Sequence, residues 1–489
     1  MSQHPQPKIF TYAHFNLEAL CHRVSKLRQD VPCVSTADQR PASGSFNWAV
    51  LISFDDGIRW VFRSPHRRFS MPLEVVMKLL ASEVATMRYI SAYSDIPVPE
   101  IFDYCVSCDN DIGIPYILMS EARGWPLSKV WRPVGSPLDD LDASSKGKVL
   151  RELGDITWKL SQLRLGRIGS PFEENGSFEV KECLSRGHML HERYDLEIPR
   201  GPFASDAEFY NSLISAFLEH AEALQLSHHC FIAPVPLPNN YEMRTLYTDA
   251  VNLWNDFVAV GNKIDSSINR RDYVIAGDAL RDILARDIIP SLESPETTEE
   301  TFPLCHPDLS VNNIFVDDDI NITCIIDWAF ASSIPEFMLL PAPGLPQYGD
   351  EVSSQLRLRF TDGFIAALPE STEKRSVDKY RKSLEQSQLS WKNIGKYFFQ
   401  QRCSPHYIQI LNELQKDDQQ PEKVEKEERE YFRNREFRHT IARKLTLVSE
   451  WNLQHGVSMP RRLRRDMFVA SPKLWKWILE FIQDWEETF

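Results

Sequence analysis

The sequence lacks the features that mark several large classes of protein. Its 489 residues contain no run of about 18 apolar residues, so no membrane-spanning helix is predicted. The first ten residues lack the apolar stretch that a secretory signal needs. Positive charge is in deficit, because 55 Lys and Arg stand against 69 Asp and Glu and leave a net charge of −14. Nucleic-acid binders and proteins that read anionic membranes rely on basic patches, so neither partner is expected.

The cysteines form no dense framework either. Nine are scattered from Cys21 to Cys403, and the lone C-x-x-C of Cys105 and Cys108 has no second pair at the spacing of a zinc ribbon. We therefore expect reduced thiols and a cytoplasmic location. Residues 8–28 are mildly amphipathic and basic, which keeps a mitochondrial transit segment as the alternative.

The first 120 residues show the pattern of a small antiparallel sheet with one inserted helix. Alternating residues run into Asp55-Asp56-Gly57, a strong hairpin signal. Apolar residues at steps of three and four follow Pro72 and predict a helix. The predicted elements are two hairpin strands (48–54 and 58–64), a helix (73–93) and two further strands (101–106 and 115–119).

Beyond residue 119 the pattern becomes mainly helical, and the fold class predicted is α+β with two lobes. The small lobe is an antiparallel sheet, and the large lobe is helical. The predicted divisions are an N-terminal lobe (1–119), a hinge (120–124), a C-terminal lobe (125–371) with a helical insertion (171–300), and a helical C-terminal extension (372–489).

The stretch from Leu304 to Trp328 carries the polar residues that indicate chemistry. It divides into a loop (306–313), a short strand (314–316), an acidic turn (317–319) and a second strand (322–326) that ends at Asp327. Polar side chains at strand ends and in the adjoining loops are aimed into a common cleft by the sheet.

Phosphoryl transfer needs this set of groups. One carboxylate orients the attacking hydroxyl and takes its proton, while an amide oxygen and a second carboxylate hold magnesium against the phosphates. The spacing H-x-D-x-x-x-x-N before a strand-terminal Asp fits that template. Asp308 is the candidate base, Asn313 and Asp327 are the candidate metal ligands, and His306 is a buried residue that braces the loop.

A nucleotide also needs a cation on an upstream strand, held by an acid on a helix. Arg63 lies on the predicted return strand, and Glu83 lies in the predicted helix. Val61 shares the face of Arg63 and is the candidate residue under adenine. An ordinary ion pair is the alternative reading of Arg63 and Glu83.

Two loops complete the candidate nucleotide site. Residues 41–47, which include Gly44 and Ser45, precede the sheet and are predicted to cover the phosphates with backbone amides. Glu121 and Ala122 of the hinge are predicted to supply backbone hydrogen bonds to adenine. One glycine in the covering loop is fewer than a phosphate-binding loop usually carries.

These segments resemble the aminoglycoside phosphotransferase and choline kinase family, and in particular its large fungal branch. The resemblance covers roughly residues 40–335. It implies a protein-kinase-like fold, ATP as donor, magnesium, and transfer to a hydroxyl of a small molecule. The segments that carry it are GSFNW (44–48), WVFRSP (60–65), SEVATMRYI (82–90), IPVPE (96–100), PYILMSEARG (115–124), CHPDLSVNNIFVDD (305–318) and IIDWAFAS (325–332).

By this resemblance the family's base falls on Asp308, its metal ligands on Asn313 and Asp327, and its phosphate-binding cation on Arg63. The chain departs from the family in two places. Arginine stands at 63 where protein kinases carry lysine, and a planar guanidinium is not equivalent to a point charge. Asn312 stands where many relatives have glycine.

Three functions follow from these residues. The first is an ATP- and magnesium-dependent transfer of the γ-phosphate to a small-molecule hydroxyl. The second, a protein kinase, is disfavoured because Leu309-Ser310 replaces Leu-Lys and because Ile334-Pro335-Glu336 follows Asp327 too closely for a substrate-docking segment. The third is a nucleotide-binding pseudokinase or interaction protein. The sequence leaves the acceptor and the oligomeric state open.

Overall fold

The computed structural model divides the chain into two compact units. The first comprises Met1–Leu213 and Leu292–Phe399, and the second comprises Ile214–Ser291 and Gln400–Phe489. Both predicted lobes contribute to the first unit. The structure describes residues 7–66, 71–132, 136, 138–190, 192–223, 231–234, 241–248, 281, 301–346, 352–399 and 467–470.

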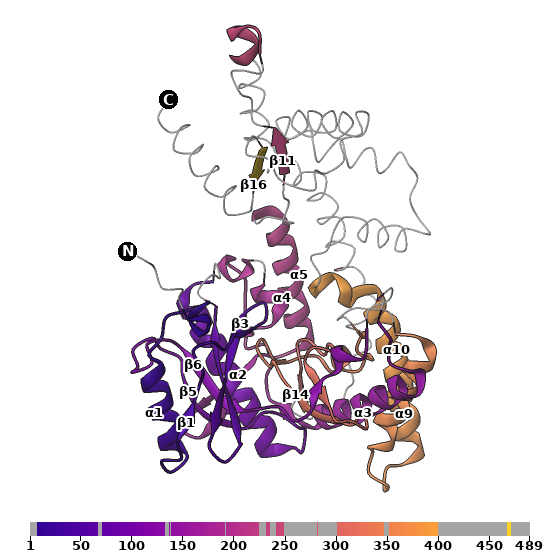
Figure 1. Cartoon of the computed structure of the whole chain (residues 1–489). Coiled ribbons are helices and arrows are strands. Elements are labelled where there is room, and N and C mark those ends of the chain that lie inside the picture. Colours follow the sequence, from indigo (N-terminus) through magenta and orange to yellow (C-terminus); the bar gives the residue numbers. More distant parts are fainter. Residues whose placement is uncertain are drawn as a thin grey trace. The chain divides into compact units, whose positions relative to one another are not determined.

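The first unit begins with a six-stranded antiparallel sheet (Figure 1). Its strands run in the order β1-β3-β4-β6-β5, and β2 pairs with β3. In β3 every second residue is buried, so this strand places Trp48 and its alternate neighbours in an aromatic core. The predicted hairpin and the two further strands are confirmed, with these bounds: β1 (Cys33–Val34), β2 (Ala42–Ser43), β3 (Asn47–Phe54), β4 (Arg59–Pro65), β5 (Ile101–Cys105) and β6 (Tyr116–Ser120).

Two helices accompany this sheet, together with a 3-10 turn at Lys8–Phe10. Helix α1 (Leu17–Leu27) is capped by the Asn16 side chain, which accepts the Ala19 backbone N–H. Helix α2 (Leu73–Tyr93) matches the predicted helix and buries Glu83 near its middle. A buried helix face therefore holds the acid that the sequence paired with Arg63.

A β-hairpin lies against α2, where the sequence predicted helices. The prediction of a helical insertion from residue 171 is wrong at this point, because β9 (Ser170–Glu174) and β10 (Ser177–Lys181) pair antiparallel. Asn175-Gly176 connects them with two positive φ angles, the turn chemistry of a tight hairpin. Arg88 of α2 bonds Glu173 at 2.8 Å, so the hairpin also fixes the helix that carries Glu83.

The rest of the first unit is mainly helical. Helices α3 (Ala143–Gln162) and α9 (Ser354–Ala366) can pack closely because Gly154 of α3 has no side chain. A Cβ at Gly154 would lie 2.1 Å from the Phe360 carbonyl oxygen of α9. The sheet region followed by this helical region confirms the α+β class. The other helices and 3-10 turns are Leu127–Lys129, α4 (Arg186–Met189), Arg193–Asp195, α8 (Glu336–Leu339) and α10 (Lys374–Phe399). Helix α5 (Asp206–Ala223) belongs to this unit as far as Leu213, and its remaining residues belong to the second unit.

Two small sheets support the polar stretch near residue 308. One has the order β15-β12-β8 and the other β14-β13-β7. Gly124 directly precedes β7 and has φ +81°, a conformation that favours glycine. A Cβ at Gly124 would also lie 2.1 Å from the Val316 carbonyl oxygen. The strands are β7 (Trp125–Pro126), β8 (Arg164–Leu165), β12 (Phe302–Cys305), β13 (Ile314–Val316), β14 (Ile322–Ile325) and β15 (Ser332–Ser333).

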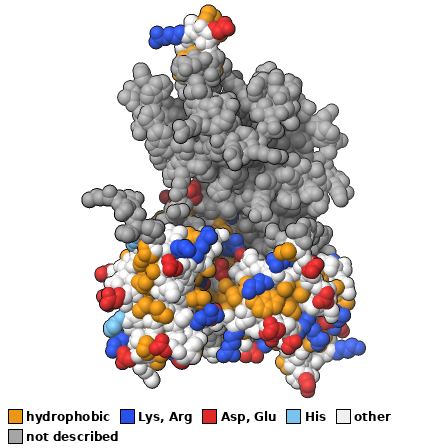
Figure 2. All heavy atoms as spheres, in the orientation of Figure 1, with side chains coloured by type: hydrophobic (Ala, Val, Ile, Leu, Met, Phe, Trp, Pro, Cys, Tyr) orange, Lys and Arg blue, Asp and Glu red, His pale blue; other side chains and the backbone are white. Residues whose placement is uncertain are grey.

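In the second unit the structure describes an antiparallel pair formed by β11 (Phe231–Pro234) and β16 (Met467–Ala470). The predicted insertion beyond residue 248, apart from residue 281, and the predicted extension beyond residue 399, apart from β16, lie outside the described residues. Within the described ranges, no helix has both the length and the apolar character to cross a membrane. On the face shown in Figure 2, the described residues present acidic and basic side chains in mixture beside apolar ones.

Candidate functional site

The loop that follows β12 is held in shape by His306. Its ring is buried and packs edge-on against Trp328, with 4.4 Å between the ring centroids. Nε2 donates to the Ile326 carbonyl at 3.0 Å, and Nδ1 accepts the backbone N–H of Asp308 at 3.0 Å. Burial lowers the pKa of His306, so the ring is neutral and both nitrogens are used for positioning.

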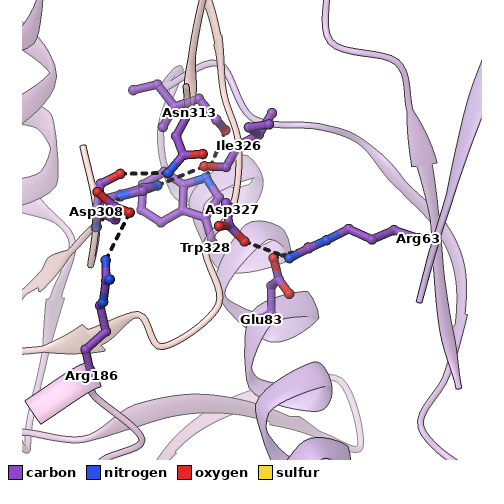
Figure 3. Close-up of polar contacts among 10 residues, drawn as sticks. Arg63, Glu83, Arg186, Asp308, Asn313, Ile326, Asp327 and Trp328 are labelled. Atoms are coloured by element: carbon purple, nitrogen blue, oxygen red, sulfur yellow. Dashed lines mark hydrogen bonds and ion pairs between the residues drawn. The ribbon is translucent and has the colours of Figure 1, made fainter. Parts of the chain in front are cut away.

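Asp308 lies at the centre of this loop with its two carboxylate oxygens in different surroundings. Oδ2 forms an ion pair with Arg186 Nη1 at 3.0 Å (Figure 3). Oδ1 is buried and has no hydrogen-bond partner among the described residues. A buried carboxylate oxygen without a donor is costly, so its surroundings favour a hydroxyl or water as donor. This is the atom expected of a base that receives a hydroxyl proton.

Asn313 joins the loop to the end of β14. The side-chain Nδ2 of Asn313 donates to the backbone carbonyl of Asp308 at 3.0 Å. The backbone carbonyl of Asn313 accepts the Ile326 N–H at 2.9 Å. Because Nδ2 is used within the loop, Oδ1 is the side-chain atom left to bind a cation. The backbone link to Ile326 places Asn313 beside Asp327, as Figure 3 shows.

Asp327 occupies a strained position two residues after the end of β14. Its φ is +65°, in the left-handed region that residues other than glycine rarely adopt. The next residue anchors the segment, because the Trp328 indole is fully buried and its Nε1 donates to the Ile325 carbonyl at 3.0 Å. The Asp327 side chain is 43% exposed, which leaves it accessible to a ligand.

Arg63 reaches this segment from the N-terminal sheet. It lies in β4 and donates through Nη1 to Glu83 and through Nη2 to Asp327 Oδ1 at 2.7 Å (Figure 3). The Arg63 and Glu83 side chains are 10% and 4% exposed. Burial raises the pKa of Glu83, and the Arg63 guanidinium opposes that rise. The predicted ion pair is present, and it extends to Asp327.

The other predicted nucleotide-binding residues lie on or beside the strands of the N-terminal sheet. Gly44 and Ser45 lie between β2 and β3 in a turn closed by the Gly44 N–H and the Asn47 carbonyl at 2.9 Å. Val61 is half-buried in β4, opposite Met119 of β6. Ala122 follows the end of β6.

Glu121 makes a side-chain contact that the sequence did not predict. Its Oε1 forms an ion pair with Arg59 Nη2 at 2.7 Å, so this carboxylate links β4 to the predicted hinge. The hinge role predicted for Glu121 rests on its backbone and is independent of this ion pair.

Asn313 and Asp327 fit a magnesium ion in donor chemistry, since both present hard oxygen atoms. Among the described residues, no group of three or more His, Cys, Asp and Glu is arranged to hold a metal. Magnesium is commonly bound by one or two protein ligands, with phosphate oxygens and water filling the other positions. Two protein ligands therefore suit a site that is completed by a nucleotide.

Sequence reasoning missed two residues that contact this group. Arg186, at the start of α4, binds Asp308, and no motif surrounds it in the sequence. Phe46 of the covering loop packs on Phe330, with ring centroids 5.1 Å apart. Phe330 is three residues after Asp327 and has φ +70°. The phenylalanine in GSFNW was the available signal for this contact.

Comparison with known proteins gives distant relatives. No family model matches the chain. A subtelomeric hrmA-associated cluster protein of Aspergillus fumigatus is 24% identical over 355 residues, which is 70% of this chain and 65% of that protein. The chain thus spans about two thirds of the length of these relatives. Altered inheritance of mitochondria protein 9 of Saccharomyces cerevisiae is 30% identical over 135 residues, 27% of this chain and 21% of that protein.

Similar solved structures include two small-molecule kinases by their descriptions. A candidate fructosamine-3-kinase of Thermobifida fusca has a TM-score of 0.42 at 12% identity, and the match covers 82% of this chain and 100% of that one. An ethanolamine kinase of Plasmodium vivax has a TM-score of 0.40 at 11% identity, with 78% and 77% covered.

Proposed function

We propose that this chain is an ATP- and magnesium-dependent phosphotransferase that moves the γ-phosphate to a hydroxyl of a small molecule. The observation that carries the proposal is the grouping of Asp308, Asn313 and Asp327 opposite the Arg63–Glu83 pair (Figure 3). A base, two oxygen ligands and a cation are the parts that phosphoryl transfer uses.

In the proposed reaction Asp308 Oδ1 accepts the hydrogen bond of the acceptor hydroxyl and takes its proton. The hydroxyl oxygen forms a bond to the γ-phosphorus, while the bond from that phosphorus to the β–γ bridging oxygen breaks and leaves its electron pair on ADP. His306 keeps the Asp308 backbone in place during this step. The orphaned, buried Oδ1 is the feature of the chain that supports the role of base.

Arg63 is the proposed ligand of the phosphates. It bonds Asp327 in this structure, and in the proposed complex it turns from that carboxylate to the phosphate oxygens while Glu83 keeps it in place. Asn313 and Asp327 are the proposed ligands of magnesium, which supplies charge neutralisation between the β- and γ-phosphates.

The nucleotide's other proposed contacts follow the sequence. Val61 lies under adenine, the backbone of Glu121 and Ala122 in the hinge (120–124) bonds its edge, and Gly44 and Ser45 cover the phosphates.

The direct test replaces the base without changing its size. Asp308→Asn is expected to lower phosphate transfer from labelled ATP by a factor of about a hundred or more, since general bases contribute about that much. The matched control is Asp319→Asn, the same exchange at an exposed position between β13 and β14. Equal transfer by Asp308→Asn and wild type, on a substrate that the wild type phosphorylates, would refute the assignment.

A pseudokinase is the second candidate, and a specific observation favours it. Both candidate catalytic acids are paired with arginines, Asp308 with Arg186 and Asp327 with Arg63. In that case the chain binds Mg-ATP without turning it over. Calorimetry that shows tight binding of Mg-ATP, with neither phosphate transfer to any tested alcohol nor release of free phosphate, would establish the pseudokinase.

The proposed location is the cytoplasm. Two proteins whose similarity extends over about a quarter of this chain carry the word mitochondrial in their names, so mitochondria are the alternative. Imaging the full chain with a C-terminal fluorescent tag, against a mitochondrial dye, decides between the two compartments.

A further inference from the structure

The carboxylate of Asp308 is held at one of its two oxygens. Oδ2 forms the ion pair with Arg186 Nη1 at 3.0 Å, and the buried Oδ1 has no hydrogen-bond partner among the described residues (Figure 3). The side-chain rotation that moves the two oxygens of an Asp is soft and has broad minima. A contact at Oδ2 therefore decides where Oδ1 lies.

The neighbours of Asp308 in the loop fix its backbone and leave its side chain to Arg186. The Asp308 N–H donates to His306 Nδ1 at 3.0 Å, and the Asp308 backbone carbonyl accepts from Asn313 Nδ2 at 3.0 Å. Neither bond reaches the carboxylate. Within the described part of the chain, the carboxylate itself is bonded by Arg186.

Arg186 is carried by a segment that buried contacts hold in place. It is the first residue of α4, and His188, two residues later, is fully buried. The His188 ring bonds the Ser185 hydroxyl at 2.8 Å and the Ser212 hydroxyl at 3.0 Å. The Arg186 side chain is 25% exposed. Its backbone is thus anchored in the core, while its guanidinium reaches the carboxylate from the side of solvent.

The same segment packs against the chain that follows Asp327. Leu184 and Leu190, on either side of α4, belong to one hydrophobic cluster with Ala329 and Phe330. This packing joins α4 to the stretch that carries both candidate acids.

We infer that Arg186 is a positioning residue for the base: it holds Asp308 Oδ2, so that Oδ1 is the oxygen turned to the acceptor hydroxyl. This inference rests on the proposed function. A misplacement of about 1 Å can lower a rate by about a hundredfold, so a fixed carboxylate is of direct use to a base. The inference also reconciles an arginine on Asp308 with activity, because the ion pair occupies one oxygen and leaves the other.

A cavity beside Arg186 makes a sharp test possible. Its volume is about 90 Å³, and it is lined by Arg186 together with Pro307 and Leu309, the neighbours of Asp308 in the chain. That is room for roughly six water-sized groups, more than a free guanidinium ion needs. If Arg186 is shortened to alanine, guanidinium from solution can therefore take the place of the lost group and bond Oδ2. A side chain that served only the fold would not be replaced in this way.

Turnover is measured with the full chain as loss of labelled γ-phosphate from Mg-ATP, in water alone and with glycerol or glucose as acceptor. Arg186→Ala and Arg186→Met, the second of which keeps the apolar stem, are expected to lower kcat about thirtyfold and to leave KM for ATP within about twofold of wild type. Arg186→Lys is expected to keep most of kcat, since the ion pair uses one nitrogen. Guanidinium at about 50 mM is expected to raise kcat of Arg186→Ala about tenfold, while urea, its neutral analogue, has no effect.

Two controls show whether Arg186 acts through Asp308. The double variant Arg186→Ala, Asp308→Asn is expected to lose no more kcat than Asp308→Asn alone, because nothing is left to position once the base is gone. Neither of these two proteins is expected to respond to guanidinium. Arg23→Ala removes a guanidinium from its pair with Asp103 at 2.8 Å, and it is expected to keep wild-type kcat with or without guanidinium.

The inference is overturned if the folded Arg186→Ala or Arg186→Met variant keeps wild-type kcat, or if the losses of the two single variants multiply in the double variant. It is also overturned if guanidinium and urea act alike on Arg186→Ala. In each of these cases turnover by the wild type leaves the proposed function standing. A wild type that binds Mg-ATP in calorimetry but transfers phosphate to no tested acceptor is a different result, which overturns the proposed function and the inference with it.

Discussion

Acid is expected to destabilise this protein through His188, a buried histidine in α4. Its Nε2 bonds Ser212 Oγ at 3.0 Å and its Nδ1 bonds Ser185 Oγ at 2.8 Å. The Ser212 hydroxyl donates to the Pro199 carbonyl, so the Ser212 oxygen accepts from His188 Nε2–H. The other ring nitrogen, Nδ1, then carries no proton and accepts from the Ser185 hydroxyl. The neutral ring is therefore fully bonded, and an added proton on Nδ1 would replace an acceptor with a donor.

The size of the effect follows from the pKa. Burial, together with the nearby Arg193 and Arg200, lowers the pKa of His188 from 6.5 to about 3. Above the unfolded pKa neither state holds the proton, so the folded state loses nothing. Below it the unfolded chain binds a proton that the folded chain refuses, and stability falls until about pH 3. At pH 5 the interval of 1.5 pH units corresponds to about 2 kcal/mol.

The assay compares the urea unfolding of wild type and His188→Asn at pH 7.5 and pH 5. The variant loses stability at both pH values, but the drop between them is expected to be about 2 kcal/mol smaller than in wild type. His306 is present in both proteins, so its own contribution to the pH dependence of stability cancels when the two drops are compared. His22→Asn, at an exposed position of α1, controls for the loss of one histidine. Equal drops in wild type and His188→Asn would refute the reasoning.

His188 also bears on function, because Ser185 and His188 flank Arg186 at the start of α4. A proton that disrupts α4 is expected to release Arg186 from Asp308 before the whole unit unfolds.

Two further predictions concern packing and the buried ion pair. Gly363→Ala places a Cβ 1.8 Å from the Arg151 carbonyl oxygen, so we expect it to destabilise the chain by about 3 kcal/mol or more in thermal unfolding. Gly166→Ala has no atom within 4 Å and is expected to stay near wild type, and similar melting of the two variants would contradict this account. Glu83→Gln leaves a buried Arg63 with only Asp327, which is expected to cost about 3 kcal/mol and to lower kcat/KM for ATP about a hundredfold. Unchanged kinetics for ATP would remove Arg63 from the proposed nucleotide site.

Local patterns were enough to predict most of the regular structure in the first 120 residues. The hairpin at Asp55-Asp56-Gly57 and the helix 73–93 were both recognisable because turn chemistry and helical period act over a few residues. The same kind of signal was present at Asn175-Gly176, where we predicted helix and the structure has a hairpin. That error came from weighing the helical character of the wider region above a specific turn.

The candidate site divides in the same way. His306, Asp308, Asn313 and Asp327 lie within one short stretch, so their spacing around two strands was sufficient to predict that they meet. The contact of Arg63 with Asp327 joins residues 264 positions apart, and the sequence could only suggest it by analogy. The structure alone decided that Arg186 binds Asp308 and that an apolar cavity adjoins them.

The physical reason is the range over which each interaction acts. Hydrogen-bond periods, turn preferences and motif spacing depend on neighbours in the chain, so the residues themselves determine them. Which cation reaches which carboxylate, and what shape the space between them takes, depends on how distant helices and strands pack together. The amino-acid sequence therefore determined the candidate catalytic stretch, and the tertiary structure decided its partners and the shape of the space beside it.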